Sequence, residues 1–571
     1  MKKNKFLAIM LSLLIGVAAF VSGGCNIGGK QRIDYGNRLP LKVFSYNGGI
    51  GSNWLTDVIA RFEEANKDRQ FESGKVGVVI DWTPGGQNIE DLSVLGTKEE
   101  TVFFNQNVNY ITQRAGTFQD ISDLVTGSNP YETDKTIESK LSDDMQDALT
   151  ALDGNYYVLP HFQAYSGVMY NKNVFDDNML YFARYEEDYR SSDPNNAAYG
   201  FIYDDDCEKS CGPDGVFDTE DDGLPSSVDE FIALVKYIRK TDVVPFAFYG
   251  AGYSYQQKLY DALWVNIEGY DGAMAQFTFD SKGKTSSIVT GFDGDVPITE
   301  DVVITEENAY LVYQQESKYH ALRAAEFVFK DDKNYHEKSM SSSGVDKIQE
   351  LLLSGEVAML LEGTYWLNEA TDANVLGRNP KYKNQDVRFM PLPVQGYGKV
   401  TEGNGKPRTV MNIHGAYSFI NGNTESKYGA ETLQIAKEFL QFCYTDESLQ
   451  AFTVKSSTTR EIKYELSPEN YDKLTKFAKS VWDLRKDDPE NPGVQHVVND
   501  ISGNPIFVRY PRYFNMCAPQ IWASGGTPEN PAEYHPAYAF KKGSSATAKS
   551  YFLGMQKTQA WWDSLRNSVG G

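Results

Sequence analysis

The chain has 571 residues, of which 41% are hydrophobic and 23% are charged, and its net charge is −23. This length is enough for two or more domain-sized cores, and the composition is that of an ordinary globular protein. The negative charge would repel the phosphates of DNA and RNA, which argues against nucleic acid as a partner.

The N-terminal segment has the layout of an export signal. A short basic stretch precedes the apolar run Phe6 to Val21, which is followed by Ser22-Gly23-Gly24-Cys25. In a bacterial lipoprotein signal of this layout Cys25 becomes the lipidated first residue, although Ser22 to Gly24 also suit ordinary secretory cleavage. We expect residues 1–24 to be a signal peptide and residues 25–39 to be a lipidated tether that holds the protein at the outer face of the cell membrane.

Alternating strands and helices are predicted from there on. Residues 41–46 predict a strand, residues 47–51 a loop, and a helix follows whose apolar residues recur at helical spacing. Residues 76–82 predict a second strand, rich in β-branched side chains. Strand, helix and strand within this length indicate a parallel βαβ unit.

The same alternation continues to about residue 452. Further strands are predicted at 101–104, 156–160 and 245–250, a helix capped by Ser226 or Ser227, a helical pattern over 309–329, and one amphipathic helix over 431–452. This order predicts an α/β protein, with two α/β lobes.

An acidic stretch around residue 210 contains two cysteines. Cys207 and Cys211 are four residues apart, a spacing that outside the cell allows a small disulfide. The carboxylates of Asp214, Asp218, Asp221 and Asp222 offer the hard oxygen ligands that calcium prefers, and the alternative is a solvated acidic insertion. Cys443 lies on an apolar helical face and is expected to be buried, whereas no pairing is predicted for Cys517.

Aromatic residues are numerous, with 36 Tyr, 31 Phe and 8 Trp. Many of them must fill cores. In an exported protein they also suit a sugar-binding cleft, because the C–H faces of a sugar stack on aromatic rings while its hydroxyls bind amides and carboxylates.

Five short segments resemble one known family. They are residues 58–66, residues 153–160 with 169–175, residues 224–231, residues 355–359 with Glu362-Gly363-Thr364-Tyr365-Trp366, and residues 436–442 with 446–448. By their order and spacing the chain resembles the extracellular, family 1-like solute-binding proteins of ABC transporters, in the subgroup that mostly takes sugars. It is longer than a typical member, which predicts insertions at 180–225 and 270–345.

This resemblance implies a two-lobed, type II periplasmic-binding-protein-like α/β fold, with ligand held in the cleft between the hinged lobes. Residues 40–160 with 414–457 would form lobe 1, and residues 161–413 would form lobe 2. Residues 458–571 would be a C-terminal segment, mainly in lobe 2, with helices packed on the hinge. The implied function is that of a monomer without catalytic activity or a required cofactor. It would capture an oligosaccharide and deliver it to the membrane-spanning permease subunits of an ABC transporter.

Candidate ligand contacts lie after predicted strands and next to the crossings between lobes, where such folds bind ligand. Each has an ordinary structural alternative: a polar turn, a core aromatic residue, or a structural histidine. The candidates are Asn105, Gln106, Asn107, Gln163, Tyr165, Trp264, Tyr365, Trp366 and His414.

Other functions stay open on the sequence alone. A secreted glycosidase would need two carboxylates flanking the scissile bond, such as Glu362 with Glu99 or Glu100, but no sequence pattern points to that geometry. A surface adhesin or scaffold would need repeats or an exposed apolar face, and neither is evident. The sequence does not name the sugar, and the ligand of a binding protein of this kind could be another polar solute.

Overall fold

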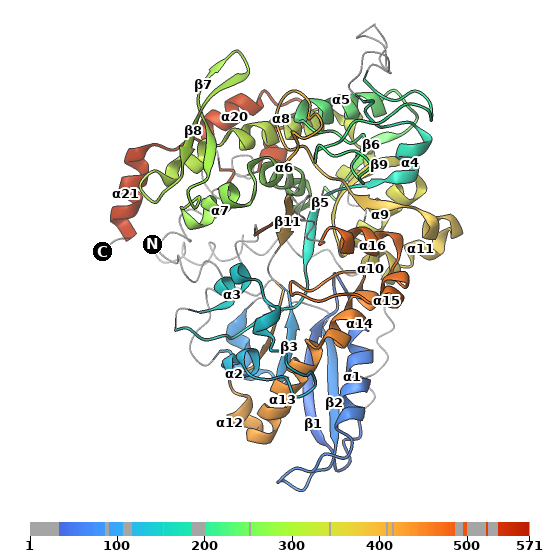
Figure 1. Cartoon of the computed structure of the whole chain (residues 1–571), viewed down its shortest axis with the longest axis vertical. Coiled ribbons are helices and arrows are strands. Elements are labelled where there is room, and N and C mark those ends of the chain that lie inside the picture. The colour runs from blue at the N-terminus through green and yellow to red at the C-terminus, as the bar shows by residue number, and fades with distance from the viewer. Residues whose placement is uncertain are drawn as a thin grey trace, which may run out of the picture.

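The computed structural model describes residues 33–85, 89, 91–106, 117–151, 153–184, 200–250, 253–341, 344–406, 409–413, 416–485, 495–498, 521–523 and 535–569. Cys25, Asn107, His414 and Cys517 lie outside these ranges, so the predictions made for them are not addressed by the structure. The described chain forms two lobes, each built around its own sheet (Figure 1).

Lobe 1 contains a five-stranded sheet in the order β2-β1-β3-β12-β4. Its strands are β1 (Leu39–Tyr46), β2 (Val78–Gly85), β3 (Val102–Asn105), β4 (Leu159–Pro160) and β12 (Tyr417–Ile420). β1 pairs in parallel with both β2 and β3, as the βαβ pattern predicted. The carboxyl ends of these three strands therefore share one edge of the sheet.

The helices of lobe 1 cover this sheet. They are α1 (Asn53–Ala65), α2 (Ser122–Thr126), α3 (Asp143–Leu149), α12 (Thr424–Tyr428), α13 (Ala430–Cys443) and α14 (Asp446–Ser456). α1 buries Trp54, Leu55, Val58, Ile59 and Phe62, the residues that predicted it. The single helix predicted over 431–452 is instead two helices, because the Thr445 hydroxyl caps α14 by accepting from the Ser448 amide.

Lobe 2 contains a six-stranded sheet. Five of its strands pair in the order β13-β11-β5-β9-β6, and the sixth, β10, pairs with β5. The bounds are β5 (Ala164–Asn171), β6 (Val244–Ala247), β9 (Val357–Gly363), β10 (Val387–Phe389), β11 (Thr409–Ile413) and β13 (Gln495–Val498). β6 and β9 are parallel, so their carboxyl ends also share an edge.

Most of the other helices belong to lobe 2 (Figure 1). They are α4 (Lys172–Asp177), α5 (Val228–Ile238), α6 (Tyr253–Glu268), α7 (Tyr270–Thr278), α8 (Glu316–Lys330), α9 (Val345–Ser354), α10 (Trp366–Asp372), α11 (Val375–Arg378), α15 (Pro468–Asp472), α16 (Lys476–Asp483), α19 (Pro536–Ala539), α20 (Ala548–Met555) and α21 (Gln559–Val569), with α15 near the junction of the lobes. Ser227 caps α5, as predicted. The antiparallel hairpin of β7 (Thr285–Asp293) and β8 (Val296–Val303) was not predicted. None of the helices in the described ranges is long and apolar enough to cross a membrane.

The chain changes lobes where the two sheets approach each other. It passes from β4 to β5 through residues 161–163, and it returns from β11, which ends at Ile413, to β12, which begins at Tyr417 and is preceded by Ala416. A third segment joins them after α14, where the Gln163 amide donates to the Thr459 carbonyl at 2.7 Å. We refer to these three segments as the hinge.

The disulfide predicted between Cys207 and Cys211 is not formed. Both are buried free thiols, and they face different neighbours. The Cys207 Sγ atom lies 3.1 Å from Asp204 Oδ1, and the Cys211 Sγ atom lies 3.7 Å from the Val400 carbonyl. The two thiols belong to separate apolar clusters.

The structure does not confirm the predicted calcium site. The Asp221 carboxylate accepts from the Asp214 amide at 3.0 Å and the Thr219 hydroxyl at 2.5 Å, and Asp222 accepts from the Asp218 amide at 2.8 Å. Among the residues described, no three or more acidic, histidine or cysteine side chains are grouped to hold a metal ion. The loop uses its carboxylates to bind its own backbone.

We therefore expect that a chelator will not destabilise the protein. Differential scanning calorimetry with and without excess EDTA should give the same melting temperature, because no carboxylate group in this loop depends on a metal. A drop in melting temperature with EDTA that added calcium restores would contradict this assignment.

A buried lysine holds the base of lobe 1 together. Lys140 Nζ forms ion pairs with Glu132 and, at 2.8 Å, with Asp446, and it donates to the Tyr444 carbonyl at 2.9 Å. The Lys140 side chain is 5% exposed, whereas Lys135, which also pairs with Asp446, is 49% exposed. The two lysines share a partner but differ in burial.

Replacing Lys140 with Met should lower the free energy of unfolding by about 3–5 kcal/mol, because it leaves the Glu132 carboxylate, which is 13% exposed, without its ion-pair partner. Lys135→Met is the matched control and should cost less than about 1 kcal/mol, as exposed ion pairs do. Urea unfolding of both variants measures this. Equal losses would show that burial of the lysine is not what matters.

Candidate functional site

The loops that follow β1 and β3 in lobe 1 and β9 in lobe 2 approach one another where the two lobes face each other, a region that we call the gap. β1 ends at Tyr46 and β3 at Asn105 in lobe 1, and β9 ends at Gly363 in lobe 2. Ligands of α/β proteins bind outside these ends of the strands, where backbone and loop side chains are available. The site is therefore built from the loops that follow these strands.

The loop after β1 reaches lobe 2. Gly49 has φ of +62°, a conformation that favours glycine. A Cβ atom on Gly49 would lie 3.4 Å from Gln106 Oε1 and 3.7 Å from Tyr365 Cβ. A Cβ atom on Gly51 would likewise lie 3.6 Å from Asp372 Oδ2. The loop thus lies so close to lobe 2 that a side chain at Gly49 or Gly51 would contact Tyr365 or Asp372.

Tyr365 is held in place from behind by a buried lysine. Lys258 Nζ donates to the Tyr365 hydroxyl at 2.6 Å and to the Ser166 hydroxyl at 3.0 Å. Its charge lies 4.9 Å from the centre of the Tyr255 ring and 5.1 Å from that of Tyr365. The Tyr365 ring also folds back over Gly363, where a Cβ would approach it to 2.5 Å. These contacts fix the ring at the lobe 2 wall.

Two buried carboxyl groups lie behind this wall. Burial raises the pKa of the Glu362 carboxyl to about 7, opposed by the charge of Lys258. Burial, and then the charge of Glu362, raise the pKa of Glu369 to about 8. Burial lowers the pKa of the Lys258 ammonium group. With one lysine beside two such groups, the wall retains a carboxyl proton near neutral pH.

The predicted contacts after β3 have different roles. The buried Asn105 side chain bonds to both backbone groups of Ile89, accepting at 3.1 Å and donating at 2.9 Å, so it holds the loop that follows β2. Gln106 is half-buried and reaches the Gly49 loop. Of this pair, Gln106 is the residue placed at the gap.

Gln163 and Tyr165 belong to the hinge. The Gln163 Oε1 atom accepts from the Thr459 hydroxyl at 2.7 Å and from the Tyr165 hydroxyl at 3.1 Å, and its carbonyl accepts from the Thr458 hydroxyl at 2.8 Å. Both Gln163 and Tyr165 are buried. Their side chains link two of the hinge segments, a role that sequence position alone did not distinguish from ligand contact.

Two tryptophans predicted to line the cleft are core residues. Trp264 is fully buried in lobe 2, and its indole donates to Gln315 Oε1 at 3.0 Å. Trp366 is 2% exposed and packs edge-on against Phe477 of α16, with ring centres 5.3 Å apart. Trp366 is the first residue of α10, whereas Tyr365 precedes the helix and remains partly exposed.

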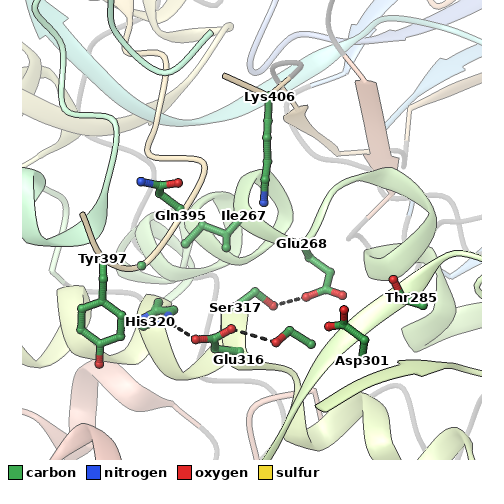
Figure 2. A pocket seen from close by; sticks show the side chains of 12 residues that line it. Ile267, Glu268, Thr285, Asp301, Glu316, Ser317, His320, Gln395, Tyr397 and Lys406 are labelled. Atoms are coloured by element: carbon green, nitrogen blue, oxygen red, sulfur yellow. Dashed lines mark hydrogen bonds and ion pairs between the residues drawn. The ribbon is translucent and has the colours of Figure 1, made fainter. Parts of the chain in front are cut away.

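Lobe 2 also contains a polar cavity of about 410 Å³, shown in Figure 2. We call it the lobe 2 cavity. Glu268, Asp301, Glu316, Ser317, His320 and Lys406 are among the residues that line it. Glu268 accepts from Ser317, and Glu316 bonds to His320 at 3.2 Å. Glu268 is ten residues from Lys258 along α6, which is about 15 Å at the rise of an α-helix. The cavity is therefore separate from the gap between the lobes.

The chain matches the model of one known protein family. The model of the family "Bacterial extracellular solute-binding protein" matches residues 51–450. The chain belongs to this family. Its members bind solutes and are not enzymes, which removes the glycosidase alternative. A search of curated proteins found no match.

Solved structures of such proteins share the two-lobed architecture. RafE in complex with raffinose matches with a TM-score of 0.50 and 11% identity, over 92% of this chain and 100% of that chain. A chitin oligosaccharide binding protein matches with a TM-score of 0.50 and 12% identity, over 94% and 100%. A mannobiose complex of a binding protein from Bifidobacterium animalis subsp. lactis matches with 0.50 and 13%, over 93% and 95%. At such identities the similarity establishes the fold.

Sequence reasoning missed Lys258, Tyr255 and Gly49. Tyr255 and Lys258 are three residues apart on α6, which places them on one helix face, but no motif marks them. Gly49 was recognised only as part of a loop. Their roles follow from contacts between segments that are more than a hundred residues apart, as between Lys258 and Tyr365.

We expect Trp366→Ala to lower the free energy of unfolding by about 3–5 kcal/mol, as large-to-small changes at buried aromatic residues do. Chemical unfolding followed by circular dichroism measures the loss. If this variant were as stable as the wild type and instead bound sugar more weakly, the ring would line the cleft after all.

Proposed function

We propose that this solute-binding protein captures an oligosaccharide between its lobes and delivers it to the permease of an ABC transporter. The observation that carries the proposal is the meeting of Gly49 and Gln106 of lobe 1 with Tyr365 of lobe 2. An aromatic ring beside an amide and a loop backbone suits a sugar, which stacks its C–H face and hydrogen-bonds its hydroxyls.

Structural relatives support the ligand class. The structures that share the fold hold raffinose and mannobiose, and a third is described as binding chitin oligosaccharides. These ligands differ in their sugar units but share several linked rings with many hydroxyls. An oligosaccharide is therefore favoured over another polar solute.

The hinge gives a route to capture. Because the chain crosses between the lobes in three segments, the lobes can rotate about them and close over a ligand. Opening of the lobes would separate the Gly49 loop from Tyr365, and closure would then bring the loop onto a sugar stacked on that ring. The permease would then recognise the closed form. The protein would work as a monomer that the lipid on Cys25 holds at the outer face of the cell membrane.

Replacing Tyr365 with Ala should weaken binding of the preferred oligosaccharide at least tenfold, which is about 1.4 kcal/mol. Raffinose, mannobiose and chitobiose are the first ligands to screen by thermal shift, and isothermal titration then gives the dissociation constant. Tyr382→Ala, which removes a half-buried tyrosine on the segment after α11, is the matched control and should bind normally.

Tyr365→Phe separates the ring from its hydroxyl, since it loses only the bond to Lys258. It should retain most of the affinity if stacking dominates. Folded Tyr365→Ala protein with wild-type affinity would show that this residue does not contact the sugar.

Lipid attachment is tested by labelling cells with a fatty-acid analogue. The wild type should be labelled and Cys25→Ala should not, because the thiol of Cys25 is the proposed attachment point. Equal labelling of both proteins would contradict anchoring at this residue.

A further inference from the structure

A fully buried arginine lies in the hinge. Arg460 has an exposed fraction of 0%, and the neighbouring Thr459 bonds to Gln163 of the first crossing. Its Nε, Nη1 and Nη2 atoms have no hydrogen-bond partner among the residues that the structure describes. Because an arginine is not deprotonated in proteins, this is a permanent positive charge inside the fold.

Aromatic rings surround the guanidinium group. Its Cζ atom lies 4.4 Å from the ring centre of Phe452, 4.5 Å from Tyr444, 5.0 Å from Trp54 and 5.8 Å from Phe104. Rings stabilise a cation through their faces, but they do not replace acceptors for N–H groups in the guanidinium plane. The cage reduces the cost of the charge and leaves its donors unsatisfied.

The nearest polar groups offer the guanidinium at most one acceptor. Trp54 Nε1 and His161 Nδ1 are buried and also lack partners, and their rings lie 5.3 Å apart. The Tyr444 hydroxyl interacts with the Arg460 side chain. It also donates to the Pro160 carbonyl and bonds to Ser418, each at 2.7 Å, so it can accept from at most one guanidinium N–H group. Burial, and then the charge of Arg460, hold the pKa of His161 well below its usual value, so its ring is neutral.

No carboxylate in the described part of the chain forms an ion pair with Arg460. A buried charge without a counter-charge is among the most costly arrangements in a protein. The cluster of Arg460, Trp54 and His161 thus presents donors, one net positive charge and no negative partner.

We propose that this cluster binds one small monovalent inorganic anion of the chloride class. Such an ion balances the single positive charge of Arg460 and accepts hydrogen bonds from several N–H groups at once. A water molecule balances no charge. A phosphate or sulfate would carry more charge than one arginine offsets. The anion would tie α1, through Trp54, to the first and third hinge segments.

Because the cluster lies in the hinge, an anion bound there would affect the stability of the folded protein. The His161 amide donates to the Ala416 carbonyl of the second crossing at 2.8 Å, so all three segments converge beside the cluster. An anion that binds only the folded protein stabilises it by RT ln(1 + [anion]/Kd). Stability should therefore depend on the identity of the anion in the buffer as well as on ionic strength.

Thermal unfolding of the full mature protein tests this. At constant ionic strength, replacing sodium gluconate by sodium chloride should raise the melting temperature of the wild type, and above the dissociation constant the rise should follow the logarithm of the chloride concentration. Arg460→Met, which keeps an unbranched apolar side chain, should lose that dependence. Arg69→Met is the matched control, because Arg69 is paired with Glu438 and lies over the Phe71 ring, and it should keep the chloride dependence.

Crystals of the wild type grown in sodium bromide give a readout that does not rely on a variant folding. An anomalous bromide peak in contact with the Arg460 guanidinium and the Trp54 indole is expected. The proposal is overturned if bromide appears only at the surface, if water fills this place, or if wild type and Arg460→Met respond equally to chloride.

Discussion

The close approach of the Gly49 loop to Tyr365 is the contact on which the site depends. It joins the end of a parallel strand in lobe 1 to the end of another in lobe 2, and a residue with φ of +62° at Gly49 makes it possible. A side chain there would meet Gln106 and Tyr365 before any ligand could. The two sheets, each with parallel strands ending at the gap, are what bring these loops together.

The buried positive charges of Lys258, behind Tyr365, and of Arg460, in the hinge, are stabilised in different ways. The Lys258 ammonium group lies over two aromatic rings and donates to two hydroxyl groups, and the charges of Glu362 and Glu369 also stabilise it. Arg460 has aromatic rings and no carboxylate among the described residues. The first arrangement is balanced within the protein, and the second calls for a partner from solution.

Much of the fold could be predicted from the sequence because local patterns determine it. The spacing of apolar residues in α1 and the serine cap of α5 are read directly from neighbours in the chain. The break between α13 and α14 was missed because the apolar pattern continues through Thr445, whose capping bond decides the outcome. The β7–β8 hairpin was missed because β8 is almost entirely exposed and carries no buried alternation.

The site was harder to predict, since it depends on contacts between distant segments. One residue of difference in where α10 begins turns Trp366 inward and leaves Tyr365 at the gap, and the motif alone could not decide between them. The most direct measurement is a crystal structure of the protein with its preferred oligosaccharide. The account predicts sugar density between Tyr365 on one side and the Gly49 loop with Gln106 on the other. Sugar bound instead in the lobe 2 cavity, with the gap between the lobes unoccupied, would contradict it.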